Sequence, residues 1–335
     1  MPPGKIPKDI LEEVVFKNLG IKRKEVILGP SAGIDGAVID LGNKSLITAM
    51  DPITGALERI GWLAVNINAN DVATFGAEPM FFLSCILLPE KTDRKIVETI
   101  CTQMDKDAKE LGIAIIGGHC EVTPELPNPI VIGCTMSVTE KGNYVTAGGA
   151  KPGDKLLFTK SAGIEGTAIL AADREKQLKR ALVPMLLESA KNFYCQISVV
   201  KDAITAFKTG GVTAMHDPTE GGIFGGIHEM ADASRTGVRI SESEILIAEE
   251  TTEICKFFKI DPLQLMSSGA LLIAVKPNSL EKTLESLKKQ KIGASVIGEF
   301  LKSPNTRLLM RKDGKETSLV RPEYDHLWQA LQKKL

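Results

Sequence analysis

The chain has 335 residues, of which 43% are hydrophobic and 25% charged, and its formal net charge is −1. This length suits two domains that each bury a core, and the balanced charge provides no field that would recruit nucleic acid or an anionic membrane. The N-terminal residues show no apolar signal-peptide segment, and the longest apolar runs, of about ten residues, are too short to span a bilayer. We therefore expect a soluble, cytoplasmic protein with no nucleic-acid or membrane partner.

The six cysteines form no CxxC pair and the four histidines no HxxxH pair. Zinc-ligand spacing is therefore absent. Most of the cysteines lie in apolar stretches, where we expect them to act as small buried hydrophobic residues in a reduced state.

The first half alternates patterns typical of helices and strands. A Gly42-Asn43 turn separates the first two strands, Thr92-Asp93 suits the start of the second long helix and Gly112 its end. We predict alternating elements built on a four-stranded sheet. The elements are, in chain order, helix 8–19, strands 36–41 and 45–50, helix 56–75, strand 80–89, helix 92–111, and strands 113–118 and 128–142.

A turn, Lys151-Pro152-Gly153-Asp154, marks the best domain boundary, which predicts domains 1–150 and 151–335. The second half again alternates strands and helices. Its predicted elements are strand 155–160, a glycine-spaced segment 161–173 that enters a helix, helical patterns over 181–208, strand 212–215, a tight loop and helix over 216–234, strand 271–275, helix 278–289 and strand 294–300.

Several acidic residues of the first half stand where a ligand could meet the backbone. Asp35 lies in a glycine-containing loop before an apolar strand, and Asp51 follows a strand. Carboxylates at strand ends of α/β proteins commonly face a ligand crevice, although turns and caps are the alternative. Asn70 and Asp71 interrupt an apolar helix, where burial without a partner would be costly. A metal or a ligand hydroxyl would satisfy them, and a solvent-facing pair is the alternative.

Two glycine pairs mark further candidates. Gly117-Gly118 follow a strand and allow close backbone approach next to three polar residues, His119, Glu121 and Thr123. A satisfied loop histidine is the alternative reading of His119.

The second pair ends the segment His216-Asp217-Pro218-Thr219-Glu220-Gly221-Gly222, which joins a strand to an amphipathic helix. Asp or Thr can cap this helix, proline fits its first turn, and the glycines should expose amide groups, so the helix start suits a phosphate. Plain capping is the alternative. The chain has neither a Walker A sequence nor GxGxxG after a strand, which excludes a P-loop and a Rossmann dinucleotide site.

Taken in order, these segments make the chain resemble the superfamily of aminoimidazole ribonucleotide (AIR) synthetase, selenophosphate synthetase, thiamine-monophosphate kinase and HypE. The matching segments are GxDGAVIDLG, the strand end at Asp51, NANDVATFGAEP, GGHCEVTP, KPGDKLLFTK, HDPTEGG and VIGEF. Each is weak alone, but their order and spacing are specific and cover nearly the whole chain. The resemblance is strongest to HypE and to AIR synthase-related proteins.

The resemblance implies an α/β fold of two domains. The N-terminal domain would contribute its sheet to a barrel in a homodimer, the C-terminal domain would be an α/β sandwich, and ATP would lie between the domains with Mg²⁺. By motif match, the magnesium-binding acids would be Asp35, Asp51, Asp71 and Asp217. The cofactor-binding residues would be Asn70, His119, Thr219, Gly221 and Gly222, and the candidate catalytic residues are His119 and Glu121.

Two departures from the relatives bear on the reaction. Most relatives carry two adjacent acids where this chain has Ile34-Asp35, and HypE ends in a modified cysteine whereas the last cysteine here is Cys255. HypE-type thiocyanate formation and selenophosphate synthesis are therefore not expected.

We expect an ATP-dependent enzyme that phosphorylates or dehydrates a small substrate or a modified group, in hydrogenase or metallocofactor maturation. One alternative is a non-catalytic dimeric HypE-like protein that binds a maturation partner. A second is a nucleotide-independent protein whose aspartates only cap and turn the chain.

Overall fold

The computed structural model describes residues 6, 8–31, 33–55 and 57–333, and the chain divides into two compact units. The N-terminal unit comprises Ile21–Pro30 and Asp35–Tyr144. The C-terminal unit comprises Val145–Leu335, with Met1–Gly20 and Ser31–Ile34, as far as these are described. No helix in the described part of the chain is long and apolar enough to cross a membrane.

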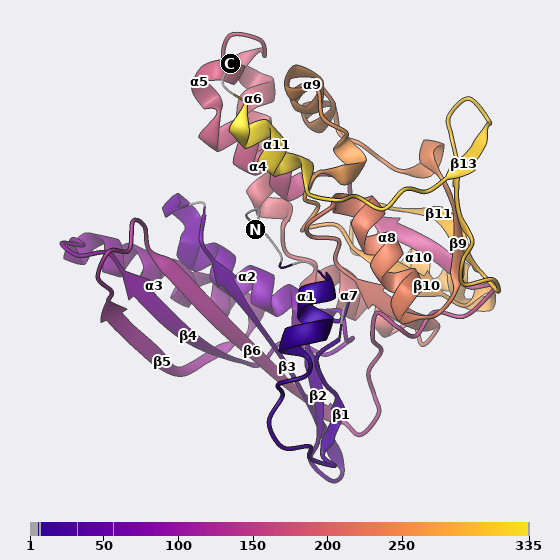
Figure 1. Ribbon diagram of the computed structural model, residues 1–335, viewed down its shortest axis with the longest axis horizontal. Helices are drawn as coiled ribbons and strands as arrows, with labels where there is room; N and C mark the ends of the chain where they lie inside the picture. Colours follow the sequence, from indigo (N-terminus) through magenta and orange to yellow (C-terminus); the bar gives the residue numbers. More distant parts are fainter. Residues whose placement is uncertain (1–5, 7, 32, 56, 334–335) are drawn as a thin grey trace. The chain divides into compact units, whose positions relative to one another are not determined.

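The N-terminal unit is built on a six-stranded sheet in the order β1-β2-β3-β6-β4-β5 (Figure 1). The predicted four-stranded sheet is wrong: all five predicted strands join one sheet, and β1, too short to show an alternating pattern, adds a sixth. Paired strands run antiparallel except β4 and β5, which are parallel. The strands are β1 (Val26–Leu28), β2 (Ala37–Asp40), β3 (Lys44–Ile53), β4 (Phe81–Leu88), β5 (Ala114–Val122) and β6 (Ile130–Glu140).

Two helices of this unit, α2 (Ile60–Ala73) and α3 (Arg94–Leu111), pack on each other and on the sheet. A single 3₁₀ turn, η2 (Leu57–Arg59), precedes α2. The predicted ends of α3 are confirmed: the Asp93 carboxylate accepts a hydrogen bond from the Lys95 amide, and Gly112 takes the left-handed conformation with φ 72°. Helix α2 is buried on almost every residue, because β3 and β6 cover one side and α3 another.

The sheet face opposite the helices is apolar and only partly covered. Along β3, β4 and β6 every second residue is buried and the residues between are half-buried or exposed. Leu46, Leu83, Ile132, Met136 and Val138 lie on this second face. Alternation of this kind is typical of a sheet with one face on a core.

Strand β5 continues through Val122, so the expected loop position of His119 and Glu121 is wrong: both lie on the strand. The strand kinks at two glycines, Gly117 and Gly118, with φ 145° and 149°. A Cβ at Gly118 would lie 1.9 Å from the Ser84 carbonyl oxygen of β4, so no other residue fits there. The pairing of β4 with β5 shifts at this point, as in a β-bulge.

The C-terminal unit has a seven-stranded sheet in the order β13-β12-β9-β11-β7-β10-β8. Among the described strands of this unit, only β9 and β12 pair in parallel. The strands are β7 (Lys155–Thr159), β8 (Val212–His216), β9 (Gly237–Ser241), β10 (Leu272–Val275), β11 (Ala294–Leu301), β12 (Arg307–Met310) and β13 (Glu316–Ser318).

Strands β7, β8 and β10 are buried on both faces, so the predicted α/β sandwich is confirmed. Four short 3₁₀ segments also occur: η3 (Asn192–Gln196), η4 (Glu242–Glu244), η5 (Pro262–Gln264) and η6 (Pro277–Ser279). The helices are α4 (Ile164–Asp173), α5 (Glu175–Leu178), α6 (Pro184–Lys191), α7 (Val200–Phe207), α8 (Gly222–Ala233), α9 (Glu249–Phe258), α10 (Leu280–Lys289) and α11 (His326–Gln332).

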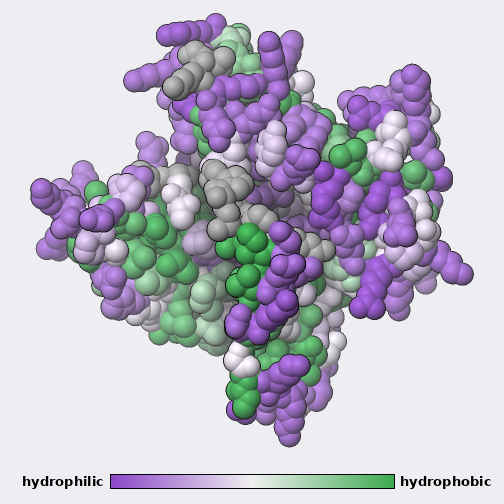
Figure 2. Space-filling model, in the orientation of Figure 1, coloured by the Kyte–Doolittle hydropathy of each residue, from purple (hydrophilic) through white to green (hydrophobic). Residues whose placement is uncertain are grey.

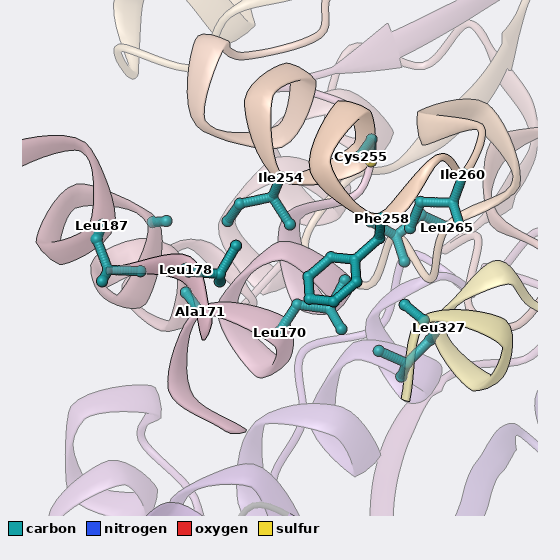
Figure 3. Close-up of a cluster of buried hydrophobic side chains, with 12 residues drawn as sticks. Leu170, Ala171, Leu178, Leu187, Ile254, Cys255, Phe258, Ile260, Leu265 and Leu327 are labelled. Atoms are coloured by element: carbon teal, nitrogen blue, oxygen red, sulfur yellow. The ribbon is translucent and has the colours of Figure 1, made fainter. Parts of the chain in front are cut away.

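A hydrophobic cluster joins α4, α5, α6, α9 and α11 (Figure 3). Leu327 of α11 and Phe258 of α9 both belong to this cluster, which also contains Leu170 of α4. The last described helix is therefore part of the core of this unit.

Two sequence expectations fail at the surface. The predicted helix 8–19 is α1 (Lys8–Ile10) followed by a π-helical turn, η1 (Leu11–Val15), and ends before Gly20. Residues 11–15 bury no side chain, so no packing surface extends the helix. Only Cys255 of the six cysteines is buried, because the others lie on half-exposed or exposed positions.

Candidate functional site

Asp51 lies on the helix-covered face near the end of β3, where a buried asparagine of α2 binds its backbone. The Asp51 N–H donates to Asn68 Oδ1 at 2.7 Å, and Asn68 Nδ2 donates to the Asp51 carbonyl at 3.2 Å. On the neighbouring strand β6, a Cβ at Gly133 would lie 2.4 Å from Asn68 Nδ2. Asn68 therefore packs tightly over the β3–β6 pair and fixes α2 at Asp51.

Asn70 and Asp71 are buried near the end of α2, with 0% and 4% exposure. The solvent-facing alternative for this pair is therefore wrong. Asp71 follows Asn68 by three residues, so the two share a face of the helix, the face that meets β3. The Thr74 hydroxyl donates to the Asp71 carbonyl at 2.7 Å and closes the last turn of the helix.

Asp35 lies just before β2 and is half-buried. Ala37 pairs with Thr48 across the β2–β3 hairpin, and a Cβ at Gly36 would lie 2.7 Å from the Thr48 carbonyl oxygen. Continuing this antiparallel register by two residues brings Asp35 to Met50, next to Asp51. The backbone of Asp35 therefore lies near the end of β3 that carries Asp51, and Asp71 lies on the face of α2 that meets this strand. A set of carboxylate oxygens suits Mg²⁺, which prefers hard oxygen ligands.

His119 and Glu121 form a hydrogen-bonded pair on the edge strand β5. His119 Nε2 lies 3.1 Å from the Glu121 carboxylate, and the Thr123 hydroxyl donates to the same carboxylate at 3.2 Å. These bonds, with that to His119 the stronger, lower the pKa of Glu121. Both side chains are at least half exposed, at 64% and 50%.

Strand β5 lies three positions from β3 in the sheet, about 14 Å away at the usual strand spacing. Within the N-terminal unit the structure therefore does not bring His119 and Glu121 to the three aspartates. The two residues form a separate polar pair on the sheet edge.

In the C-terminal unit, Asp217 follows β8 and is 1% exposed. The preceding His216 is fully buried, and its Nε2 lies 2.8 Å from the Glu229 carboxylate on α8. This pair anchors the end of β8 to the helix that follows the loop.

The amide groups of the two glycines in this loop are not exposed as predicted. The Gly221 N–H donates to Asp325 Oδ2 at 2.7 Å, and the Gly222 N–H donates to the Thr219 carbonyl at 3.1 Å. Helix α8 begins at Gly222 with Gly221 as its N-cap and no side-chain cap, so the predicted capping by Asp217 or Thr219 is also wrong. The glycines are required for a different reason: Gly222 has φ 61°, and its Cβ would lie 2.6 Å from the Leu265 carbonyl oxygen.

Sequence reasoning missed three residues that organise these sites: Asn68, Glu229 and Asp325. Asn68 stands in the quoted segment NANDVATFGAEP, where a third polar residue in an apolar helix was a usable signal. Asp325 precedes an apolar helical pattern and could have been read as an N-cap. Glu229 shows no local signal, because only the fold brings it to His216.

The C-terminal unit also holds a cavity of about 760 Å³, lined in part by Lys160, Glu242, Asp261 and Ser295. In the described part of the chain, none of the predicted site residues lines this cavity. The partly buried Lys160 ammonium there donates to the Ser198 carbonyl at 2.7 Å and lies 3.4 Å from Asp202.

Comparison with known proteins identifies the class to which this fold and these segments belong. The family model "AIR synthase related protein, N-terminal domain" matches residues 33–139, and the corresponding C-terminal domain model matches 151–311. The chain belongs to the AIR synthase-related family, which confirms the predicted resemblance.

Among its relatives, a protein of Methanocaldococcus jannaschii named for hydrogenase expression and formation is 29% identical over 88% of each chain. The carbamoyl dehydratase HypE of Rhodobacter capsulatus is 25% identical over 92% of this chain and 89% of the relative.

Solved structures of HypE share the fold. HypE in a HypE–HypF complex has a TM-score of 0.77 at 23% identity, covering 93% of this chain and 99% of that one. HypE in complex with ATP has a TM-score of 0.73 at 20% identity, covering 97% of each chain. The predicted two-domain AIR synthase-like fold is confirmed.

Proposed function

We propose that this protein is a magnesium-dependent, ATP-binding enzyme of the AIR synthase-related family that phosphorylates or dehydrates a small substrate or a modified group. The relatives named for carbamoyl dehydration and for hydrogenase formation favour a step in hydrogenase or metallocofactor maturation. The observation that carries the proposal is the burial of Asn70 and Asp71 in α2, the helix that Asn68 ties to Asp51 near the end of β3.

In this proposal Asp35, Asp51, Asp71 and Asp217 hold magnesium. Asn70 and Thr219, with Gly221 and Gly222, line the nucleotide site. Bound magnesium would offset negative charge on the phosphoryl group being transferred. The two glycines act through their backbone shape, because their amide groups are already engaged.

Burying a carboxylate inside a helix costs free energy, and a bound metal or nucleotide would account for the presence of Asp71 in α2. Asn68 contributes by positioning: its two hydrogen bonds to Asp51 prevent β3 and α2 from separating. His119 and Glu121, on exposed β5, stay the predicted catalytic candidates, but within this unit they lie about 14 Å from β3, so we assign them no step at the magnesium site. The domains 1–150 and 151–335 are part of this proposal.

The test is calorimetric titration of ATP with and without magnesium. We expect binding only with magnesium, and a loss of at least about tenfold in affinity in Asp71→Asn and in Asp217→Asn. Asp105→Asn is the matched control, since Asp105 is an exposed carboxylate of α3 that forms a surface ion pair with Lys109. Binding of equal strength in both site variants would overturn the assignment.

A nucleotide-turnover assay distinguishes an enzyme from the alternative, a non-catalytic partner in maturation. We expect ADP formation in the presence of an acceptor and its loss in the same two variants. A stable complex with a maturation protein such as HypF, without any nucleotide turnover, would favour the alternative.

We also propose a cytoplasmic homodimer formed through the sheet of the N-terminal unit. Strand β5 is an exposed edge of nine residues, and Ile115, Ile116 and Val122 on it are 41%, 53% and 58% exposed. Long exposed edges with apolar side chains are normally covered by another chain. Apolar surface is visible over this part of the molecule in Figure 2.

Sedimentation should therefore give a dimer at micromolar concentration, and Ile116→Lys should give a folded monomer. Ile96→Lys, on the exposed side of α3 with 43% exposure, is the control that should stay dimeric. A monomeric wild-type protein would contradict this part of the proposal.

A further inference from the structure

The last described part of the chain, residues 319–333, runs along helix α8 and ends in α11. The neutral His228 of α8 donates from Nε2 to the Leu319 carbonyl at 3.1 Å, and Arg321 pairs with Asp232 of the same helix. Further on, Leu327 enters the hydrophobic cluster (Figure 3). This segment, here called the C-terminal segment, is thus held at several points within its own unit.

One residue of the C-terminal segment reaches the loop that contains Asp217. Asp325 is 2% exposed, and each of its carboxylate oxygens has its own amide donor. Oδ1 accepts from Leu327 at 2.7 Å and caps α11, while Oδ2 accepts from Gly221 at 2.7 Å. The Met266 amide also donates to this carboxylate.

Only a carboxylate satisfies this set of donors. An asparagine offers one acceptor oxygen, and its NH₂ group would face one of the amide donors. Burial, followed by the charge of Glu220, raises the pKa of Asp325 to about 7, although the three amide bonds lower it. A helix cap alone needs no such burial, since Asp93 caps α3 from an exposed position.

The loop needs an external anchor because of its glycines. Gly221 and Gly222 follow each other in the left-handed region, at φ 79° and 61°, and glycine has more conformational freedom than any other residue. The His216–Glu229 pair holds the loop where it leaves β8. The Gly221–Asp325 bond holds it where it enters α8, and Pro322 packs against Gly221 from the same segment.

We propose that Asp325 is a positioning residue for the loop 217–222: it fixes the Gly221 amide and thereby keeps Asp217 and Thr219 in the arrangement that binds the ligand. The role as positioner of the loop stands on this geometry alone. Its consequence for ATP rests on the proposed function.

The first test measures the loop without any ligand. In wild-type protein the Gly221 amide should be among the slowly exchanging amides. In Asp325→Asn, hydrogen exchange over 217–226 should become about tenfold faster, the factor expected for one lost charge-assisted hydrogen bond. The control is Asp261→Asn, because Asp261 likewise caps a short helix of this unit by accepting from the Leu263 amide.

The second test measures Mg-ATP affinity at a temperature well below the melting temperature of each variant. We expect about tenfold weaker binding in Asp325→Asn and unchanged binding in Asp261→Asn. If the wild-type protein binds no Mg-ATP, the proposed function fails while the exchange experiment still decides the role of Asp325.

Two results would overturn the proposal. One is rapid exchange of the Gly221 amide in wild-type protein, which needs no variant to fold. The other is an Asp325→Asn variant with faster exchange only in α11 and with wild-type exchange over 217–226, because Asp325 would then be no more than the cap of α11.

Discussion

The buried His228 makes a quantitative prediction about acid stability. It lies on α8 with 6% exposure and donates to the Leu319 carbonyl. Burial, followed by the nearby charges of Arg321 and Arg307, lowers its pKa from 6.5 to about 4. The folded protein therefore keeps His228 neutral at pH values where an unfolded chain protonates it.

The direction of this pH dependence of stability follows from proton linkage. Between pH 6.5 and 4 the unfolded state binds more protons at this site, so the stabilising contribution is complete above pH 6.5 and declines as the pH falls. With these two pKa values, lowering the pH from 7.5 to 5.0 costs about 2 kcal/mol of unfolding free energy. Such a loss is a large part of the stability of an ordinary domain.

The assay is urea unfolding at pH 7.5 and 5.0 for the wild type and for His228→Gln, whose side-chain amide can still donate to Leu319. The wild type should lose about 2 kcal/mol more than the variant over this range. His119→Gln, which removes an exposed histidine, is the control and should behave as the wild type. Equal pH dependence of the wild type and His228→Gln would refute the reasoning, since all other titrating groups are shared.

Two further substitutions test buried polar contacts. Asp202→Asn removes the counter-charge of the partly buried Lys160, 3.4 Å away, and should cost about 3 kcal/mol in urea unfolding, the lower end of the range for a buried pair. A loss below about 1 kcal/mol would show that the carbonyl oxygens around the ammonium suffice. Gln103→Ala removes the Oε1 atom that accepts from the Gly61 amide at 3.0 Å and the Trp62 amide at 3.4 Å at the start of α2. It should cost about 1 kcal/mol, and Gln103→Glu, which keeps an acceptor, should recover most of it in the same assay.

Local sequence patterns predicted the larger elements well. Alternating and continuous apolar runs marked β4, β6, β7 and β10, because side chains on a strand point to opposite faces and buried strands must be apolar. The ends of α3 could be predicted from Thr92-Asp93 and Gly112, because capping residues act within one turn of a helix end, and the structure shows Asp93 as the N-cap. The short strands β1, β9, β12 and β13 were not predicted, because three to five residues show too little periodicity.

The candidate site likewise contains residues that local patterns predicted and contacts that they did not. Asp35, Asp51, Asp71 and Asp217 could be chosen from their positions beside glycines, at strand ends and inside an apolar helix. The hydrogen bond of the Gly221 amide could not be predicted in this way, because its acceptor, Asp325, lies 104 positions away. A pairing of this kind depends on the path of the whole C-terminal segment.

The sequence by itself therefore determined the family, the α/β class and the candidate residues for a ligand site, because these depend on residue type, order and spacing. The tertiary structure decided how those residues are held: Asn68 against Asp51, Glu229 against His216, and Asp325 against Gly221. Each of these contacts joins positions far apart in the chain or on different elements. Their free energy arises only when folding excludes water from both partners, which no local pattern records.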